Sequence, residues 1–445
     1  MNQRSLVFAG SVLGGFALLG GLALISAQAA APSTKSQVDL AKMEAQKGEW
    51  SRWRGPNGDG ISAEKGLLKV WPKEGPPLAW QAKGFGEGHS SVAVAGGKIF
   101  TLGRKNGKTE MIAANLKDGC ILWSTPFGDG DKPNCTPTVD GNLVFGISCG
   151  GDLACCDTKT GKLLWSKNFP KDFGGKMHSG WGYSESPLVD GDLLIATPGA
   201  NKAMLVALDK KTGKVIWQTE ASREQLGRDG GDGAAYASIV ISHAAGVKQY
   251  VTLVGRGLIG VDAATGELLW NYSPVANGTA NIPTPIVSGD YVFGSSGYNK
   301  GSALVKIVKS GDKLEAEEVY FLQGNELQNH HGGMIRLGNH IYLGHGENNG
   351  IPVCIDMTTG KVAWRVEKSP GGASAAIAYA DGHLYFRYQD ATMALIEANP
   401  KAYKLKGKFQ TKTHNGDGWA HPVIAGGKLY LRDQDDLLCY DVKAK

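Results

Sequence analysis

The chain has 445 residues, of which 42% are hydrophobic and 20% are charged. This balance excludes an intrinsically disordered chain, because enough apolar residues are present to fill a core. The 47 basic and 42 acidic residues leave a net charge of +5 without any long basic run, so nucleic acid is not an expected partner. Glycine, with 64 residues, is about twice as frequent as in an average protein, which indicates many turns between short strands.

The N-terminus has the pattern of a secretory signal peptide. Arg4 precedes an apolar stretch over residues 6–25, and Ala27-Gln28-Ala29 follows as a cleavage pattern. We therefore expect residues 1–29 to be a signal peptide, the protein to be exported to the periplasm or cell envelope, and no transmembrane segment to remain after cleavage. An uncleaved anchor is the alternative, although glycines and alanines weaken the stretch as a membrane span. The first cysteine is Cys120, which disfavours a lipid anchor.

An internal repeat is the strongest signal in the rest of the chain. Its tail has an aspartate, a Thr-Gly pair whose glycine lies four residues after the aspartate, and a tryptophan four residues after the glycine. Upstream of the tails lie apolar segments around a turn such as Asp140-Gly141, which is a hairpin signal. Each repeat therefore predicts four short strands, as in a propeller blade. Four segments share the full tail: Asp157–Trp165, Asp209–Trp217, Asp262–Trp270 and Asp356–Trp364.

The aromatic residue that ends each fourth strand gives the number of blades. The segment from Trp419 to Asp441 provides three strands, and Leu78-Ala79-Trp80 provides one strand with no blade of its own. We therefore expect an all-β fold, an eight-bladed β-propeller of four-stranded antiparallel blades, closed by the N-terminal strand joining the C-terminal blade. The expected domains are a signal peptide (1–29), an N-terminal extension (30–65) and the propeller (66–445). The aromatic series is Trp80, Trp123, Trp165, Trp217, Trp270, Tyr320, Trp364 and Phe409.

The seven cysteines do not indicate a disulfide scaffold. Cys155, Cys354 and Cys439 lie two residues before the aspartate of a repeat, where other repeats have alanine or glycine. We interpret them as packing residues at positions that need a small side chain, rather than as metal ligands or nucleophiles.

The repeat tail resembles that of the PQQ-like propellers, the quinoprotein alcohol dehydrogenase-like family, where PQQ is pyrroloquinoline quinone. The resemblance covers nearly all of the chain after residue 29, and residues 53–60 and the blade order are similar to exported PQQ-binding-like repeat proteins. The family includes quinoprotein alcohol dehydrogenases and, more distantly, the outer-membrane assembly scaffold BamB. The resemblance implies the propeller fold and leaves the function open, because one fold hosts unrelated activities.

The resemblance would imply a PQQ cofactor with calcium if the quinoprotein site were kept. The family places an acidic residue after a Gly-Ser-Ser-Gly segment, whereas residues 294–300 contain no carboxylate, and residues 329–333 lack the family's catalytic aspartate. The vicinal pair Cys155-Cys156 resembles a quinone-capping disulfide, but it falls in a third strand, where neighbouring side chains point to opposite faces. These residues give a quinone cofactor little support.

The loops that lead into the blades lie on one face of a propeller, around the mouth of the central channel. They are rich in histidine, tryptophan, asparagine and carboxylate, which predicts a pocket for a small polar ligand such as a sugar, a polyol or a quinone ring. The same residues could instead satisfy backbone groups at the strand starts. The candidate ligand-binding residues are Trp181, Glu185, Asp232, Asn281, Asn329, His330, His331, Trp419 and His421.

The sequence leaves three functions open. The first is an exported binding or scaffold module that holds a small polar ligand or an envelope protein on this face. The second, implied by the resemblance, is a quinone-dependent alcohol or polyvinyl-alcohol dehydrogenase. The third is an enzyme with a metal site built from the histidines and a carboxylate, for which the chain shows no typical ligand spacing. We predict the first, because the second lacks the acids it requires.

Overall fold

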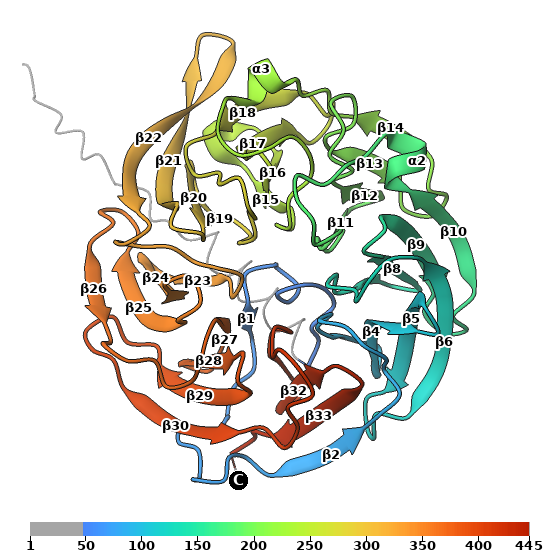
Figure 1. Ribbon diagram of the computed structural model, residues 1–445, viewed down its shortest axis with the longest axis vertical. Coiled ribbons are helices and arrows are strands. Elements are labelled where there is room, and N and C mark those ends of the chain that lie inside the picture. Colours follow the sequence, from blue (N-terminus) through green and yellow to red (C-terminus); the bar gives the residue numbers. More distant parts are fainter. Residues whose placement is uncertain (1–47, 445) are drawn as a thin grey trace, which may run out of the picture. The chain divides into compact units, whose positions relative to one another are not determined.

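The computed structural model describes residues 48–444, so the expected signal peptide lies outside the described residues. Within them, eight β-sheets are arranged as blades around a common centre (Figure 1). The prediction of an eight-bladed propeller is confirmed. No helix between residues 48 and 444 is long and apolar enough to span a membrane.

Seven blades take their four antiparallel strands from one continuous stretch of chain, from the centre to the rim. The first four are β3 (Ala93–Ala95), β4 (Lys98–Lys105), β5 (Lys108–Asn115) and β6 (Ile121–Gly128); β7 (Thr138–Asp140), β8 (Leu143–Ile147), β9 (Asp152–Asp157) and β10 (Leu163–Asn168); β11 (Leu188–Asp190), β12 (Leu193–Ala196), β13 (Val206–Asp209) and β14 (Val215–Gln218); and β15 (Val240–Ser242), β16 (Gln249–Val254), β17 (Gly257–Asp262) and β18 (Leu268–Tyr272).

The next three blades continue in the same order. They are β19 (Ile286–Ser288), β20 (Tyr291–Ser296), β21 (Gly301–Ser310) and β22 (Lys313–Gln323); β23 (Met334–Leu337), β24 (His340–His345), β25 (Ile351–Asp356) and β26 (Val362–Arg365); and β27 (Ala375–Ala380), β28 (His383–Tyr388), β29 (Thr392–Glu397) and β30 (Leu405–Gln410). The short helices α2 (Phe169–Phe173) and α3 (Arg223–Leu226) and the 3-10 turn η1 (Ala244–Gly246) lie in the connections.

The last blade combines the two ends of the propeller. It contains β31 (Val423–Ala425), β32 (Lys428–Asp433) and β33 (Asp436–Asp441), and its outer strand is β2 (Leu78–Ala82). β2 runs antiparallel to β33, with Trp80 opposite Cys439, and Figure 1 shows the blue β2 beside the red β33. The predicted closure is confirmed, and β33 is not left as an open sheet edge.

The repeat tail joins several neighbouring blades. Gly266, in the Thr-Gly turn after β17, has a φ of +78°, and a Cβ added there would lie 2.5 Å from the ring of Trp217 in the preceding blade. The same contact joins Gly161 to Trp123 and Gly213 to Trp165, at 2.6 and 2.8 Å. Only glycine combines this backbone conformation with room for the indole. The spacing of glycine and tryptophan in the repeat is therefore a consequence of packing between blades.

A segment that precedes the first blade fills the centre of the ring; we call residues 50–62 the plug. Trp50 exchanges two backbone hydrogen bonds of 2.8 Å with Val94 in β3, and β1 (Ile61–Ser62) adds a parallel strand to the inner edge of β27. Figure 1 shows β1 inside the ring. The Glu64 carboxylate fixes the base of the plug by accepting hydrogen bonds from the backbone N–H groups of Gly48, Gly426 and Gly427. The described part of the expected N-terminal extension thus packs into the ring.

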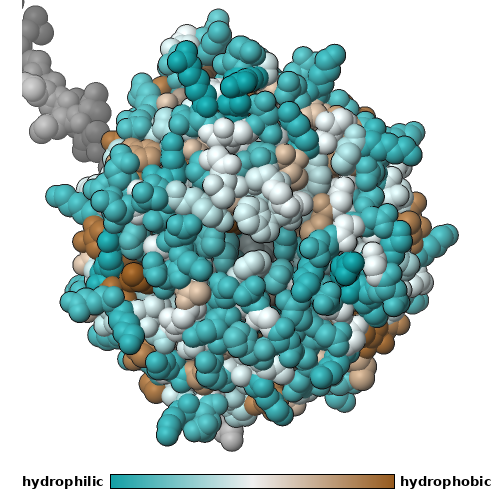
Figure 2. Space-filling view, in the orientation of Figure 1, coloured by the Kyte–Doolittle hydropathy of each residue, from teal (hydrophilic) through white to brown (hydrophobic). Residues whose placement is uncertain are grey.

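The surface of the propeller is mostly polar. Figure 2 shows one face that is largely hydrophilic and hollowed near its centre, with apolar patches toward the rim. The outer strands carry exposed aliphatic pairs, which include Leu163-Leu164 in β10 and Val215-Ile216 in β14.

The contact between Gly266 and Trp217 can be measured with two matched alanine substitutions. In Gly266→Ala, the alanine must adopt the positive φ of this position, which is unfavourable, and its Cβ also clashes with the indole. In Gly246→Ala, the alanine must adopt the same φ of +78°, but no heavy atom lies within 4 Å of the new Cβ. We expect Gly246→Ala to lower the free energy of unfolding by about 1 kcal/mol and Gly266→Ala by about 1–3 kcal/mol more.

Urea denaturation of the two variants and the wild type checks this expectation. Equal losses of stability in the two variants would show that the glycine serves only the turn and that the contact between blades contributes nothing.

Candidate functional site

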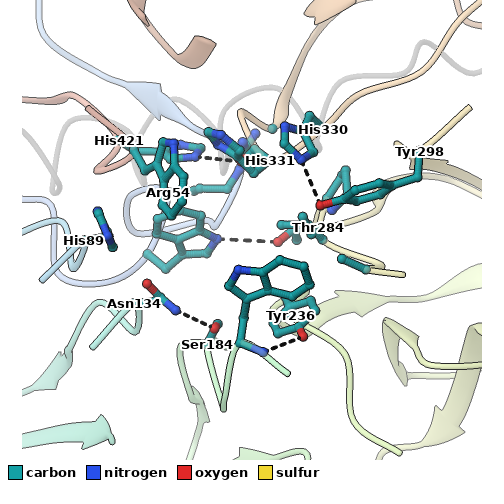
Figure 3. A pocket seen from close by; sticks show the side chains of 17 residues that line it. Arg54, His89, Asn134, Ser184, Tyr236, Thr284, Tyr298, His330, His331 and His421 are labelled. Carbon is teal, nitrogen blue, oxygen red and sulfur yellow. Dashed lines mark hydrogen bonds between the residues drawn. The ribbon is translucent and has the colours of Figure 1, made fainter. Parts of the chain in front are cut away.

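A pocket of about 290 Å³ lies at the mouth of the central channel (Figure 3). Its walls come from the loops that lead into the blades and from the hairpin between β20 and β21, and its floor comes from the plug. Propeller geometry brings these loops together although they are far apart in the sequence. The lining residues are Trp53, Arg54, His89, Asn134, Trp181, Ser184, Tyr236, Ala280, Ile282, Pro283, Thr284, Tyr298, His330, His331, Gly333, Trp419 and His421.

Aromatic rings form one continuous wall of the pocket. His89 and His331 both contact Trp419, with ring centroids 4.5 and 5.5 Å away, and His330 lies 4.8 Å from His331. Below it, Trp53 of the plug lies with its ring centroid 4.3 Å from that of His421. These rings offer flat, partly polar faces, which favour the stacking of a planar ligand.

Hydrogen bonds hold the polar side chains at the rim of this wall. His330 bonds through Nδ1 to the Ser374 hydroxyl at 2.7 Å and through Nε2 to the Tyr298 hydroxyl at 3.1 Å. Across the pocket, the Asn134 amide donates to the Ser184 hydroxyl at 2.9 Å. The rim is therefore preorganised by its own contacts, which reduces the ordering that a ligand would have to impose.

Burial keeps the pocket histidines neutral, because a charged imidazole would lose its hydration. It lowers the pKa of His89 to about 4 and that of His421 to about 3. It also lowers the pKa of His330, and it lowers the pKa of His331 well below its usual range, with the nearby imidazoles adding to the effect. Burial lowers the pKa of Arg54 only to about 10. At neutral pH the described lining therefore holds one charged side chain, and that charge is positive.

Several nitrogens at the pocket have no hydrogen-bond partner between residues 48 and 444. They are Arg54 Nη1, His331 Nε2, Trp419 Nε1 and His421 Nδ1. No carboxylate lines the pocket in the described part of the chain. Buried polar atoms in folded proteins nearly always have partners, so an unsatisfied group needs an explanation such as a ligand or an ordered water.

Five of the nine residues predicted from the sequence line this pocket. They are Trp181, His330, His331, Trp419 and His421. The other four, Glu185, Asp232, Asn281 and Asn329, lie outside the lining. Their part in ligand binding stays a prediction, and their observed contacts are structural.

Glu185 is buried behind the pocket wall. It is 2% exposed, its Oε1 accepts a hydrogen bond from the Thr197 backbone N–H, and its Oε2 has no partner in the described chain. Burial raises the pKa of this carboxyl from the usual range to about 7, against the lowering effect of hydrogen bonding by Thr197. Burial thus opposes the ionisation of Glu185.

The remaining three predicted residues support the backbone around the site. Asp232 forms an ion pair with Arg256 in the loop between β16 and β17. The Asn281 amide donates to the Gly255 carbonyl at 3.1 Å, and the Asn329 amide donates to the Gly344 carbonyl at 3.0 Å. Both asparagines are buried and bridge neighbouring chain segments. This is the role that polar residues at strand starts commonly take.

The sequence prediction did not include the two plug residues that form the floor, Trp53 and Arg54. Trp53 donates from its indole N–H to the Thr284 hydroxyl at 3.4 Å, across the centre of the pocket. Neither residue belongs to a repeat, so periodicity could not place them. The signal that could have identified them is the density of glycine after Arg54, where Gly55, Gly58 and Gly60 all have positive φ.

The cysteines form no disulfide within residues 48–444. All seven cysteines are free thiols, and Cys155 and Cys156 are fully buried within β9. Burial raises the pKa of both thiols to about 12, so neither is a ready nucleophile. Among residues 48–444, no group of three or more histidine, cysteine, aspartate or glutamate side chains is arranged to hold a metal ion.

Comparison with known families identifies the repeat. The family described as "Outer membrane protein assembly factor BamB", a PQQ-type repeat family, matches residues 131–366 and 347–443. The chain belongs to this family. The resemblance to PQQ-like propellers is confirmed, since the chain is related both to BamB proteins and to quinoprotein dehydrogenases.

Individual relatives are distant and carry different functions. The chain is 25% identical to the outer membrane protein assembly factor BamB of Kangiella koreensis over 218 residues, which is 47% of this chain and 48% of that protein. It is 24% identical to the dehydrogenase subunit of the quinone alcohol dehydrogenase of Gluconobacter oxydans over 305 residues, 64% of this chain and 38% of that one. The matches thus span about half or less of the length of these relatives.

Solved structures share the fold. The europium-containing methanol dehydrogenase superposes with a TM-score of 0.63 at 13% identity, covering 88% of this chain and 91% of that one. BamB from Moraxella catarrhalis gives 0.59 at 13% identity, with 82% and 99% covered. At this identity the likeness establishes the architecture alone.

The quinoprotein relatives raise the question of whether a calcium–quinone pair fits this pocket. Calcium takes six to eight oxygen ligands and usually needs carboxylates. The described lining supplies hydroxyl, amide and backbone oxygens, four imidazoles and a cationic arginine, but no carboxylate. The residues present therefore do not fit a bound calcium ion.

The buried Glu185 leads to a prediction about stability and pH. Its pKa is raised in the folded protein, so its contribution is fully present below about pH 4.5 and is lost as the pH rises through 7. Glu185→Gln keeps the shape and cannot ionise. We expect this variant to be more stable than the wild type by about 1–3 kcal/mol at pH 8.5, with the difference shrinking toward pH 4.5.

Urea denaturation at several pH values measures this difference. The exposed Glu315 in β22 provides a control, since Glu315→Gln should leave the pH dependence unchanged. A Glu185→Gln variant that is no more stable than the wild type at pH 8.5 would contradict the assignment.

Proposed function

We propose that this protein is an exported binding module whose pocket holds a small ligand with a flat ring. The observation that carries the proposal is the lining of the pocket. Three tryptophans, Trp53, Trp181 and Trp419, come from the plug and two different blades and surround one cavity of about 290 Å³. That volume is close to the lower limit of the range for ligand pockets, about 300–1,000 Å³, and suits a ligand of one or two rings.

The exposure of Trp181 supports the proposal. Its indole is 52% exposed at the mouth of the pocket, although a large apolar ring is normally buried. The loop that carries it is held in place, because the Trp181 backbone N–H donates to the Tyr236 hydroxyl at 3.2 Å and the same hydroxyl bonds to Ser179 at 2.6 Å. A ligand between Trp181 and the wall of Trp419 would cover this exposed ring and gain the free energy of its burial.

Export is the second part of the proposal. It is supported by the signal-peptide pattern of residues 1–29 and by a family and relatives described as outer membrane assembly factors. The proposed organisation is a signal peptide (1–29), an N-terminal extension (30–65) and a propeller (66–445) that acts in the periplasm or cell envelope. A scaffold role, with an envelope protein on the pocket face, is the alternative that the description of the family suggests.

Alcohol oxidation is supported less well by the residues of the pocket. Removing the proton of an alcohol requires a general base whose pKa is near the working pH. The described lining offers imidazoles whose pKa is lowered by burial, to about 3 in His421, and no carboxylate. These groups suit hydrogen bonding to a ligand better than proton abstraction.

Calorimetry with a pair of bicyclic probes tests the proposal. We expect the full-length mature protein to bind 2-naphthoate, 2-naphthamide or both with a Kd of about 1 mM or tighter. Trp419→Ala removes one wall of the pocket and should weaken binding about tenfold. His414→Ala, an exposed residue of the same loop that does not line the pocket, should change nothing.

Two results would contradict the proposed function. One is that neither probe binds at millimolar concentration. The other is an equal loss of binding in Trp419→Ala and His414→Ala, which would place the probe elsewhere.

A further inference from the structure

The plug presents an arginine at the centre of the ring in an unusual backbone conformation. Arg54 has a φ of +59°, a left-handed value that residues other than glycine rarely adopt. Gly55, Gly58 and Gly60 follow it with positive φ as well, so the chain turns sharply around this residue. Strained residues of this kind persist where the surrounding structure holds them, and they cluster at ligand sites.

The guanidinium of Arg54 is buried but only partly satisfied. The residue is 4% exposed, and its Nη2 donates to the carbonyl oxygens of Asp59, at 3.1 Å, and Met334. Nη1 has no hydrogen-bond partner between residues 48 and 444. No carboxylate within this range forms an ion pair with Arg54, whereas Arg256 is paired with Asp232. Burial lowers the pKa of Arg54, and the charge of the Asp59 carboxylate opposes this effect without forming an ion pair. The burial of the guanidinium is thus only partly compensated.

The position of Nη1 connects it to the pocket wall. A Cβ added to Gly333 would lie 1.9 Å from Nη1 and 3.2 Å from His421 Cε1. Gly333 and His421 both line the pocket, and Gly333 lies two residues after His331. The absence of a side chain at Gly333 is therefore what lets the guanidinium reach the floor of the pocket between these residues.

The surroundings of Arg54 favour a negatively charged group. His331 Nε2, Trp419 Nε1 and His421 Nδ1 are buried nearby without partners, and no carboxylate is present in the described lining. The neutral histidines leave Arg54 as the one charged side chain of this lining at neutral pH. His421 donates from Nε2 to the His331 carbonyl, so Nδ1 of this neutral ring is an acceptor. The positive charge of Arg54 and the unused N–H donor of Trp419 complement a carboxylate attached to a flat ring.

We propose that Arg54 binds a carboxylate of the ligand, so that the pocket selects flat aromatic or heteroaromatic acids over their uncharged analogues. This inference rests on the proposed function and specifies the ligand class of that site. The aromatic wall holds the ring, and the plug supplies the counter-charge. The selectivity of the pocket is thus set by a residue outside the blade repeats.

The pair 2-naphthoate and 2-naphthamide isolates the charge, because the two probes have nearly the same shape. We expect the wild type to bind 2-naphthoate at least tenfold more tightly than 2-naphthamide in low-salt calorimetry. Arg54→Gln should remove this preference, and Arg54→Lys should keep part of it. A purely structural role of Arg54 would weaken both probes alike and leave their ratio unchanged.

Arg52→Gln is the matched control. Arg52 lies in the same plug but does not line the pocket. Its side chain lines a second cavity of about 420 Å³, which Arg54 and Arg336 also line. The preference for 2-naphthoate should therefore survive in Arg52→Gln. If Arg54→Gln fails to fold, Gly333→Ala gives a second test, because its new methyl group would push the guanidinium away and should reduce the preference.

The outcomes separate the two proposals. Equal affinity of the wild type for both probes, or an unchanged preference in Arg54→Gln, would overturn the role of Arg54. Neither result would contradict the proposed binding pocket. Failure of both probes to bind would contradict the proposed function, and the carboxylate proposal would fall with it.

Discussion

The contact between a tryptophan and the next blade's glycine is the constraint on which the rest of the structure depends. At three junctions an indole covers the Thr-Gly turn of the next blade. Trp165 does so at Gly213, and its N–H donates to the Lys210 carbonyl of that turn at 3.1 Å. Because the contact repeats, it sets how these successive blades pack against one another. The same register brings the loops that lead into the blades to one mouth, where residues distant in sequence form a wall.

A ring built in this way leaves an axial space that the blades cannot fill themselves. The plug fills it, anchored by Trp50 against β3, by β1 against β27 and by Glu64 at its base. The site is thus a joint product of two parts of the chain. The repeats provide aromatic and imidazole walls, and the plug provides a floor that carries the one cation of the described lining. Burial, which neutralises the histidines, makes that cation the dominant electrostatic feature of the pocket.

The repeat made most of the fold predictable. The positions of Asp, Thr-Gly and Trp predicted the number of blades. The unmatched strand at Trp80 predicted the closure of the ring, which β2 forms against β33. The site was less predictable. Loop composition identified His331 and Trp419 but could not separate them from Asn281 and Asn329, which satisfy backbone groups behind the wall. The residues that line the pocket and those that satisfy backbone groups lie in loops of the same composition. They differ only in the direction in which the side chain points. The plug residue Arg54 lies outside the repeat, so only three-dimensional packing could place it.

The most direct measurement is a crystal structure of the mature protein soaked with 2-naphthoate. The account predicts electron density for one naphthoate between Trp181 and Trp419, with its carboxylate directed to the Arg54 guanidinium beside Gly333. An empty pocket at saturating concentration would contradict the account. Density only in the second cavity, beside Arg52 and Arg336, would contradict it as well.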